Sequence, residues 1–391
     1  MRRLILIVLL LLLAPRMHAA EPLSVHQLEA VLAAHIHGNK RGADQATDLL
    51  AQINREDELA PRIAQIQLSE RLTSATLHRL VATYKLGPLT RDSLELIADR
   101  SALLDPPADE IPGLPPPDLA TQRTLIHDAG AFVFQTLAHL PDFFAVRTTE
   151  HFDDAPLVMN GMVLAQTPGL HRVATYHREI TFRDGRELLT ALDRERIPLW
   201  GWGMETQGEF GPEPAIVFLD IAHGKLAFSH WEKGPSGNLA VFRYEVPAQA
   251  SHYEIRTACR VSQDSDQHPS YHGSLAVDAA AGTLVRLTLQ ADEAPGASIS
   301  GVASVIEYGP VILGQRTFIC PRRSLAFSTQ QIACPDRKHV KKLDPPILFL
   351  NRTEFTAYHR LGSESTILPG SVVQAGSNPP SVTQNPDTPH R

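Results

Sequence analysis

Regular alternation of apolar and polar residues, segment after segment through residues 143–368, restricts the fold of this chain more than any other feature. In SYHGSLAVDAAAGTLVRLTLQAD (residues 270–292), Leu275 and Leu287 belong to the apolar faces of two strands whose other faces are polar. Short turns rich in Gly, Pro and Asp separate such segments, and Gly314-Gln315 is the expected hairpin turn in GPVILGQR. The pattern predicts a large antiparallel sheet, interrupted by one helix in GPEPAIVFLDIAHG.

Helical periodicity replaces this alternation in residues 21–104. In SVHQLEAVLAAH, Ser24 and Gln27 have the spacing of a capping box. Further helices are expected at residues 43–53, 57–68, 74–87 and 90–104. Ser74 is the expected cap of the helix that it opens, and Gly87 is the expected stop. Residues 21–104 are therefore predicted to form an all-α domain.

Proline marks the boundary between the two patterns. DPPADEIPGLPPPD (residues 105–118) cannot be helical and is predicted to be an extended linker. An amphipathic helix over residues 119–141 should lead into the sheet, so that the β domain covers residues 119–368. Residues 369–391 are polar and rich in proline, which predicts a disordered tail. The predicted fold class is α+β.

The first twenty residues have the features of a signal peptide. Arg2 and Arg3 precede an unbroken apolar run over residues 4–13, which is too short to span a bilayer. Cleavage is expected after Ala19 or Ala20, leaving a periplasmic or secreted protein without a transmembrane segment. An uncleaved N-terminal anchor is the alternative.

The charge balance argues against two classes of partner. The net charge is −7, and residues 1–20 contain three arginines and no carboxylate, so cleavage makes the chain more acidic. An acidic chain without a basic block is a poor match for nucleic acid or anionic lipid. The basic segment DRKHVKK (residues 336–342) is expected to be a solvated loop, the alternative being a site for an anionic partner.

Catalytic and metal-binding signals are weak. The sequence contains no G-x-S-x-G, H-E-x-x-H, C-x-x-C or phosphate-binding glycine loop, so no catalytic residue, metal ligand or cofactor is predicted. In HGKLAFSHWE, His230 and Glu232 should share one strand face, with Trp231 on the other. With His223 nearby, an acid–base or metal site is conceivable there, although an ordinary hydrogen-bonded strand is favoured.

The chain contains three cysteines, so one of them must stay unpaired in an oxidising compartment. The expected disulfide is Cys320–Cys334, which closes a short loop. Cys259–Cys320 is the alternative.

A sheet with one continuous apolar face must have that face covered, by a helix, by the N-terminal domain or by an apolar ligand. Periodicity alone does not separate these three possibilities. If the face is the wall of a ligand pocket, the candidate ligand-binding residues are Trp200, Trp202, Trp231, Phe242, Tyr244, Leu275 and Leu287.

The order of strands in the second half of the chain resembles that in the periplasmic lipoprotein-carrier proteins. It consists of a strand, a VD turn, the strand GTLVRL and then IEYGPVILGQRTFICP. That resemblance implies a curved half-barrel whose concave apolar face holds an acyl chain. The chain also resembles an uncharacterised exported family common in Acidobacteria, and this resemblance implies no activity. The segments that carry it are RLTSATLHRL, LLDPPADEIPG, HWEKG, AVFRYEVP and SHYEI.

Three functions follow as hypotheses. The first is an exported, non-enzymatic protein that binds an apolar ligand, such as an acyl chain or a lipidated partner, on the concave sheet face. The second is a cell-envelope interaction module whose sheet is covered by its own helices. The third is a hydrolase, which would need His and carboxylate side chains that converge in a cleft.

Overall fold

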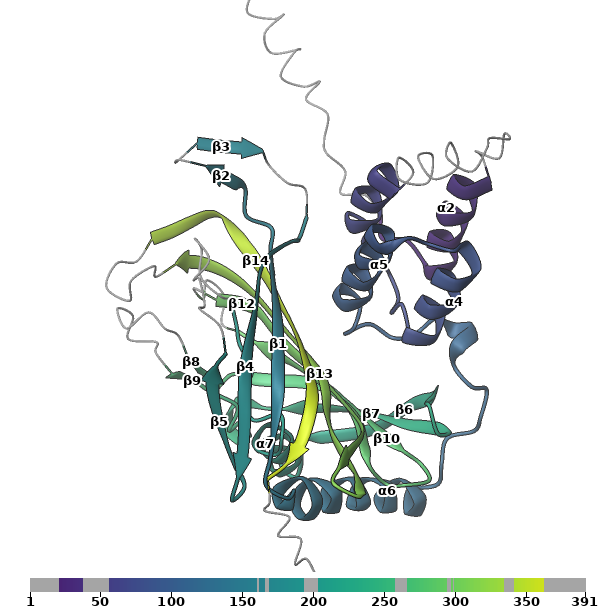
Figure 1. Ribbon diagram of the computed structural model, residues 1–391. Coiled ribbons are helices and arrows are strands. Elements are labelled where there is room, and N and C mark those ends of the chain that lie inside the picture. The colour runs from purple at the N-terminus through teal and green to yellow at the C-terminus, as the bar shows by residue number, and fades with distance from the viewer. Residues whose placement is uncertain are drawn as a thin grey trace, which may run out of the picture.

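A helical N-terminal unit and a large curved antiparallel sheet make up the computed structural model (Figure 1). The structure describes residues 21–37, 56–159, 162–165, 169–192, 203–256, 266–293, 297, 299–333 and 341–361. This architecture confirms the α+β class that the change of period predicts.

The helical unit consists of α2 (Val25–His37), a helical segment over residues 56–64, α4 (Ser74–Tyr84) and α5 (Pro88–Arg100). Its apolar faces meet in a core of their own, built from residues such as Leu28, Leu32, Ile63, Leu80 and Leu94. The predicted capping box is confirmed, because the Ser24 amide donates to the Gln27 side chain and the Gln27 amide donates to the Ser24 hydroxyl, at 2.8 and 3.1 Å. The helix expected at residues 43–53 lies outside the described residues.

Two predicted helix boundaries in this unit are wrong. The cap of α4 is Thr73 rather than Ser74, because the Thr73 hydroxyl accepts a hydrogen bond from the Thr76 amide. Lys85, in the left-handed region at φ 48°, ends α4 before Gly87 is reached. Gly87 instead precedes Pro88, which opens α5 because its fixed φ and missing N–H suit the first turn of a helix.

The proline-rich segment is extended except for one short 3₁₀ turn, η1 (Ala108–Glu110). It leads into α6 (Leu119–Ala131), which continues through a π-helical turn, η2 (Phe132–Thr136), and η3 (Leu137–His139). The Asp118 side chain caps α6 by accepting from the Thr121 amide at 2.7 Å. The expected helix over residues 119–141 is therefore present.

The sheet has ten strands in the order β5-β4-β1-β14-β13-β12-β11-β10-β7-β6 and is open, with β5 and β6 at its edges. Most neighbouring strands are consecutive in the chain and form hairpins. Strand β1 is an exception, because it lies between β4 and β14. The turn at Gly314-Gln315 joins β12 to β13 as predicted. The strands are β1 (Phe143–Asp153), β4 (His171–Arg183), β5 (Arg186–Ala191), β6 (Lys225–Lys233), β7 (Asn238–Val246), β10 (Ser270–Asp278), β11 (Leu284–Asp292), β12 (Ile299–Leu313), β13 (Arg316–Ala333) and β14 (Lys341–Arg360). Two small hairpins lie beside the sheet, β2 (Leu157–Met159) with β3 (Met162–Ala165) and β8 (Ile255–Arg256) with β9 (Asp266–Gln267).

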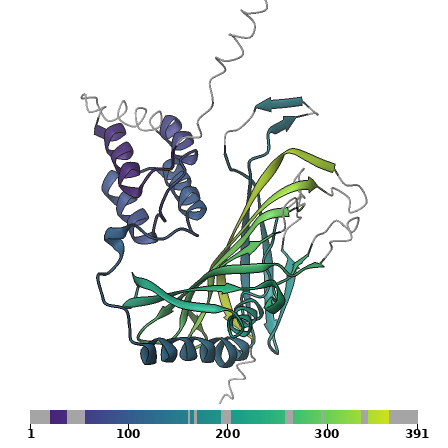
Figure 2. The same cartoon turned by 180° about the vertical axis from the view of Figure 1, so that it is seen from behind.

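Different helices cover the two faces of the sheet. On the concave face, α6, η2 and the inserted helix α7 (Pro212–Ile221) pack on the largest apolar core, and Figure 2 shows α6 crossing one end of the curved sheet. On the convex face, Leu96 of α5 and Ala102 pack on strands β12 to β14. None of the described helices is long and apolar enough to cross a membrane.

The disulfide predictions are wrong for this structure. Cys320 is a buried free thiol, so it pairs with neither Cys334 nor Cys259. Its side chain belongs to the core under the concave face, where burial raises the pKa of the thiol to about 12. Cys259 and Cys334 lie outside the described residues.

Candidate functional site

Four of the candidate ligand-binding residues lie together on the concave face. Phe242, Tyr244, Leu275 and Leu287 are each no more than 1% exposed and belong to one core cluster. The same cluster contains Leu125 of α6, Phe132 of η2 and Val217 of α7. In this structure the protein's own helices cover the face, so an apolar ligand would have to take the place of a helix.

The tryptophans divide between described and undescribed parts of the chain. Trp231 packs against the same core, with its ring centroid 5.4 Å from that of Phe228 in an edge-to-face contact. Its indole N–H donates to the Pro115 carbonyl at 2.9 Å, which fastens the proline-rich segment to β6. Trp200 and Trp202 lie outside the described residues.

Beside this apolar region, the concave face carries buried polar side chains that the sequence did not single out. Thr149 and Thr353 face each other across β1 and β14 with their hydroxyl oxygens 2.9 Å apart. Ser324 donates to Glu209, and Ser304 donates to Glu213, at 3.2 and 2.7 Å. We call this set the polar belt; it comprises Arg147, Thr149, Glu209, Glu213, Ser304, Ser324 and Thr353, and all of its members are buried.

The belt brings charges together where water is excluded. Arg147 lies 3.6 Å from Glu209 and donates to the Thr206 carbonyl at 3.1 Å. Burial and the neighbouring charge of Glu209 raise the pKa of Glu213 to about 8 and that of Glu187 to about 7. Arg147 Nε and Glu209 Oε2 are buried without a hydrogen-bond partner among the described residues. Unsatisfied groups of this kind are costly, so they mark a place where a further polar partner would be stabilising.

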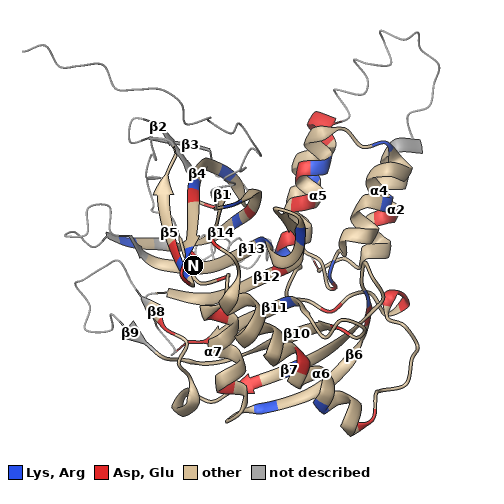
Figure 3. Ribbon diagram, turned by 60° about the horizontal axis from the view of Figure 1, so that its bottom comes forward, with Lys and Arg blue, Asp and Glu red and all other residues tan. Residues whose placement is uncertain are grey.

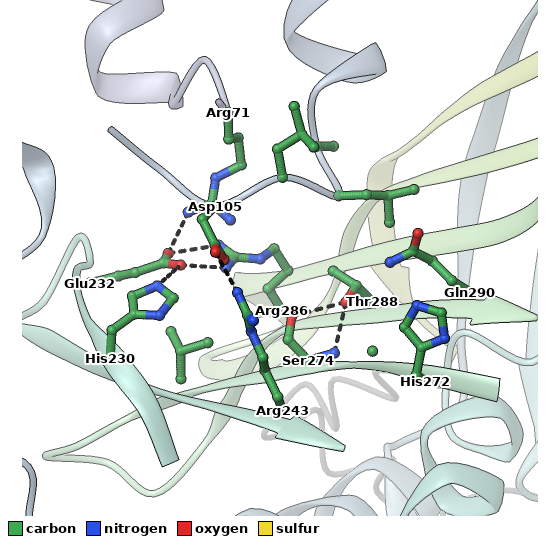
Figure 4. Close-up of a pocket in the computed structure, with 15 residues that line it drawn as sticks. Arg71, Asp105, His230, Glu232, Arg243, His272, Ser274, Arg286, Thr288 and Gln290 are labelled. Carbon is green, nitrogen blue, oxygen red and sulfur yellow. Dashed lines mark hydrogen bonds and ion pairs between the residues drawn. The ribbon is translucent and has the colours of Figure 1, made fainter. Parts of the chain in front are cut away.

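A second site lies on the convex face, between the helical unit and strands β6, β7, β10 and β11 (Figure 4). It is a cavity of about 260 Å³, which we call the Arg71 pocket. Its charged lining comes from the helical unit, the start of the proline-rich segment and the sheet, and consists of Arg71, Asp105, Glu232, Arg243 and Arg286, with His230 and His272 beside them.

Glu232 is the centre of the charge network in the Arg71 pocket. It accepts two hydrogen bonds from Arg286, at 2.8 and 3.0 Å, and it lies 2.6 Å from Arg71 Nη2. His230 Nε2 lies 3.1 Å from the same carboxylate, as the shared strand face predicts. Burial would raise the pKa of Glu232, but the bond from His230 and the charges of both arginines hold it below its usual range.

This geometry bears on the hydrolase hypothesis. His230 and Glu232 converge as that hypothesis requires, yet a carboxylate held ionised by two arginines is a weak base. Within the described ranges, no group of three or more His, Cys, Asp or Glu side chains is arranged to hold a metal ion. The contacts of this His–Glu pair are those of an ion-pair network, which agrees with the hydrogen-bonded strand that the sequence favours.

The floor of the Arg71 pocket is polar and closely packed. The Ser274 amide donates to the Thr288 hydroxyl at 2.8 Å. On the concave side of the same strands, Gly273 lets the Tyr244 hydroxyl reach the Thr288 carbonyl at 2.7 Å. A Cβ at position 273 would lie 1.9 Å from that carbonyl oxygen, so only glycine fits. Sequence reasoning identified His230 and Glu232 but missed Arg71. Arg71 lies just before α4, far from β6 in the chain, and no local pattern links the two.

The fold and these two sites define an α+β protein with an open antiparallel sheet that is covered on both faces. No protein-family model matches the chain, and no curated protein matches it. Among solved structures, it is similar to a LolA superfamily protein from Nitrosomonas europaea at 8% sequence identity and a TM-score of 0.26, over 62% of this chain and 93% of that chain. Because a TM-score of this size carries no functional weight, we base the function on this chain's own geometry. The resemblance to the acidobacterial family stays a hypothesis.

Proposed function

We propose that the protein is an exported, non-enzymatic binding protein whose concave sheet face holds an apolar ligand, such as an acyl chain, in place of part of its helical cover. The observation that carries the proposal is the division of this face. An apolar region under α6 and α7 adjoins the buried polar belt, on a sheet whose cover is helical. An acyl chain with a polar head group matches both regions.

Helix α7 is the part of the cover that a ligand would displace. Val217 of α7 is fully buried in the apolar core, but Glu213 in its first turn is buried beside Glu209 and Glu187. The crowded carboxylates oppose the apolar contacts, which lowers the free energy needed to move this helix. The ligand binds only the state in which α7 is displaced. Its apparent affinity is therefore reduced by the fraction of molecules in that state.

The test is a titration of the purified protein with a fluorescent fatty acid, followed through tryptophan fluorescence. Saturable binding at about tens of micromolar or tighter is expected. Val217→Ala should reduce the packing free energy of α7 on the sheet by roughly 1.5 kcal/mol, at about 0.8 kcal/mol per buried CH₂. Because α7 is then displaced more easily, the ligand should bind up to about tenfold more tightly.

The matched control is Val25→Ala, the same change in the core of the helical unit. It should lower stability without changing affinity. A wild-type protein that shows no saturable signal would rule out the ligand, and the concave face would then be core alone.

One observation favours the second hypothesis, the envelope interaction module. Phe242, Tyr244, Leu275 and Leu287 are already fully covered by the chain's own helices, as that function requires. A negative titration would leave this as the function.

Export is part of the proposal and is supported by Arg2, Arg3 and the apolar run at residues 4–13. N-terminal sequencing of protein from the envelope fraction should start at residue 20 or 21. A chain that starts at Met1 there would show an uncleaved anchor instead.

A further inference from the structure

The Arg71 pocket lies on the opposite side of the sheet from the proposed apolar site. Arg286 and Thr288 of β11 face the pocket, whereas Leu287 and Leu289 between and beside them belong to the concave core. Figure 4 shows Arg71 entering from the helical unit above the strands, with Asp105 beside it. A ligand in this pocket would therefore contact both units and would be independent of an acyl chain on the other face.

The lining residues carry an excess of positive charge. Three guanidinium groups face two carboxylates, since Arg71 and Arg286 share Glu232 while Arg243 pairs with Asp105. Arg71 and Arg286 are only 12% exposed, so water screens their mutual repulsion poorly. Burial and the charge of Arg286 lower the pKa of Arg71, and the carboxylates of Glu232 and Glu307 oppose that shift.

The pocket also holds donors that are not fully used. Arg286 Nε is buried without a hydrogen-bond partner among the described residues. Arg243 stands at the mouth, where its side chain is 59% exposed. Guanidinium groups that converge on one cavity match the oxygen atoms of phosphate and carboxylate groups, to which they donate charge-assisted hydrogen bonds.

We infer that the Arg71 pocket binds a small oxyanion, the phosphate or carboxylate group of a small polar molecule, between the helical unit and the sheet. The anion would balance the excess charge of the three arginines and accept from Arg243 and Arg286. Because Arg71 of the helical unit also lines the pocket, the bound anion would attract both units and so help to hold them together.

The probe is inorganic phosphate, titrated calorimetrically into the mature chain at pH 7, with chloride at equal ionic strength as the reference. Saturable binding is expected. Arg243→Gln should weaken it and Asp105→Asn, which frees Arg243, should strengthen it, each by about twofold to fivefold. Both residues are more than half exposed, so neither change should affect folding. Arg183→Gln, at a residue 74% exposed outside the pocket, removes the same charge and should bind like the wild type.

A second arm separates the two sources of a phosphate group. In this arm the protein is sedimented with phosphatidylglycerol vesicles. If the wild type sediments with them, Arg243→Gln does not, and inorganic phosphate gives no response, then the pocket binds a lipid head group. No saturable binding in either arm would overturn the inference, and so would equal binding by Arg243→Gln and Asp105→Asn. The fatty-acid titration depends on the other face of the sheet, so the two proposals can fail separately.

Discussion

Glu213 shows how a single residue can carry an energetic cost that its neighbours make tolerable. It stands in the first turn of α7, where a carboxylate is favoured by the helix dipole, but it is 7% exposed and lies near two other carboxylates. The hydrogen bond that it accepts from Ser304 does not offset burial, and its pKa rises to about 8. At neutral pH the folded protein therefore holds a proton on Glu213.

Stability should consequently depend on pH in a definite direction. The folded state keeps the Glu213 proton up to about pH 8, whereas the unfolded chain releases it near 4.5, the ordinary pKa of a glutamate, so stability falls as pH rises through this window. Glu213→Gln imitates the protonated form, so it should remove this loss, which amounts to roughly 4 kcal/mol between pH 5 and pH 8.5. Urea unfolding at pH 5 and pH 8.5 measures it.

The control for this prediction is Glu58→Gln, at an exposed position of the helical unit. It should keep the pH dependence of the wild type. If Glu213→Gln also keeps this pH dependence, then Glu213 is ionised in the folded protein. The proposal that buried carboxylates lower the free energy needed to displace α7 would then be wrong.

At the scale of elements, the proline-rich segment is held at two points along its length and is not a free linker. Thr73 and Thr76 of the helical unit each donate to Glu110 at 2.6 Å. The second point is Pro115, whose carbonyl accepts from the Trp231 indole of β6. Between these points Gly113 and Leu114 are exposed, and the exposed fraction of Leu114 is 47%.

Limited proteolysis should therefore cut within residues 105–118, near Leu114, and Trp231→Phe should increase the rate about fivefold. The reason is that one hydrogen bond contributes about 1 kcal/mol, while the aromatic packing is kept. Mass spectrometry of the early fragments gives the rate, with cleavage after Ser371 as the internal reference. An unchanged rate would mean that the contact with Pro115 does not hold the segment.

For the whole molecule, ion pairs decide how the helical unit sits on the convex face. Figure 3 shows that α5 carries both acidic and basic residues. Asp99 of α5 is 1% exposed and pairs with Arg323 of β13 and with Arg352 of β14, the latter at 2.5 Å. Arg352 also reaches Glu150 of β1 at 3.0 Å, so one arginine ties three elements together.

Asp99→Asn should lower the free energy of unfolding by about 3 kcal/mol, because it leaves a buried arginine short of its partner. Differential scanning calorimetry should then show the helical unit melting before the sheet. The exposed Asp109→Asn is the control and should melt like the wild type. Melting of Asp99→Asn as one unshifted transition would show that apolar contacts alone hold the units together.

Local patterns in the sequence determined the elements of this protein. Period-two alternation predicted the strands, and Ser24, Gln27 and Gly314 predicted a helix start and a hairpin, because capping and turn geometry depend on residues only a few positions apart. The same local reasoning misplaced the cap of α4, where Thr73 and Ser74 are both good caps and the contact of Thr73 with Glu110 favours the former.

Only the tertiary structure decided what these elements do together. The pairing of β1 with β14, the meeting of Arg71 with Glu232 and that of Asp99 with Arg352 join residues far apart in the chain, and no local pattern encodes them. The apolar face of residues 270–292 was readable from the sequence, but its cover was not. An alternating strand has the same pattern whether a helix or a ligand covers it, since both exclude water from the same side chains.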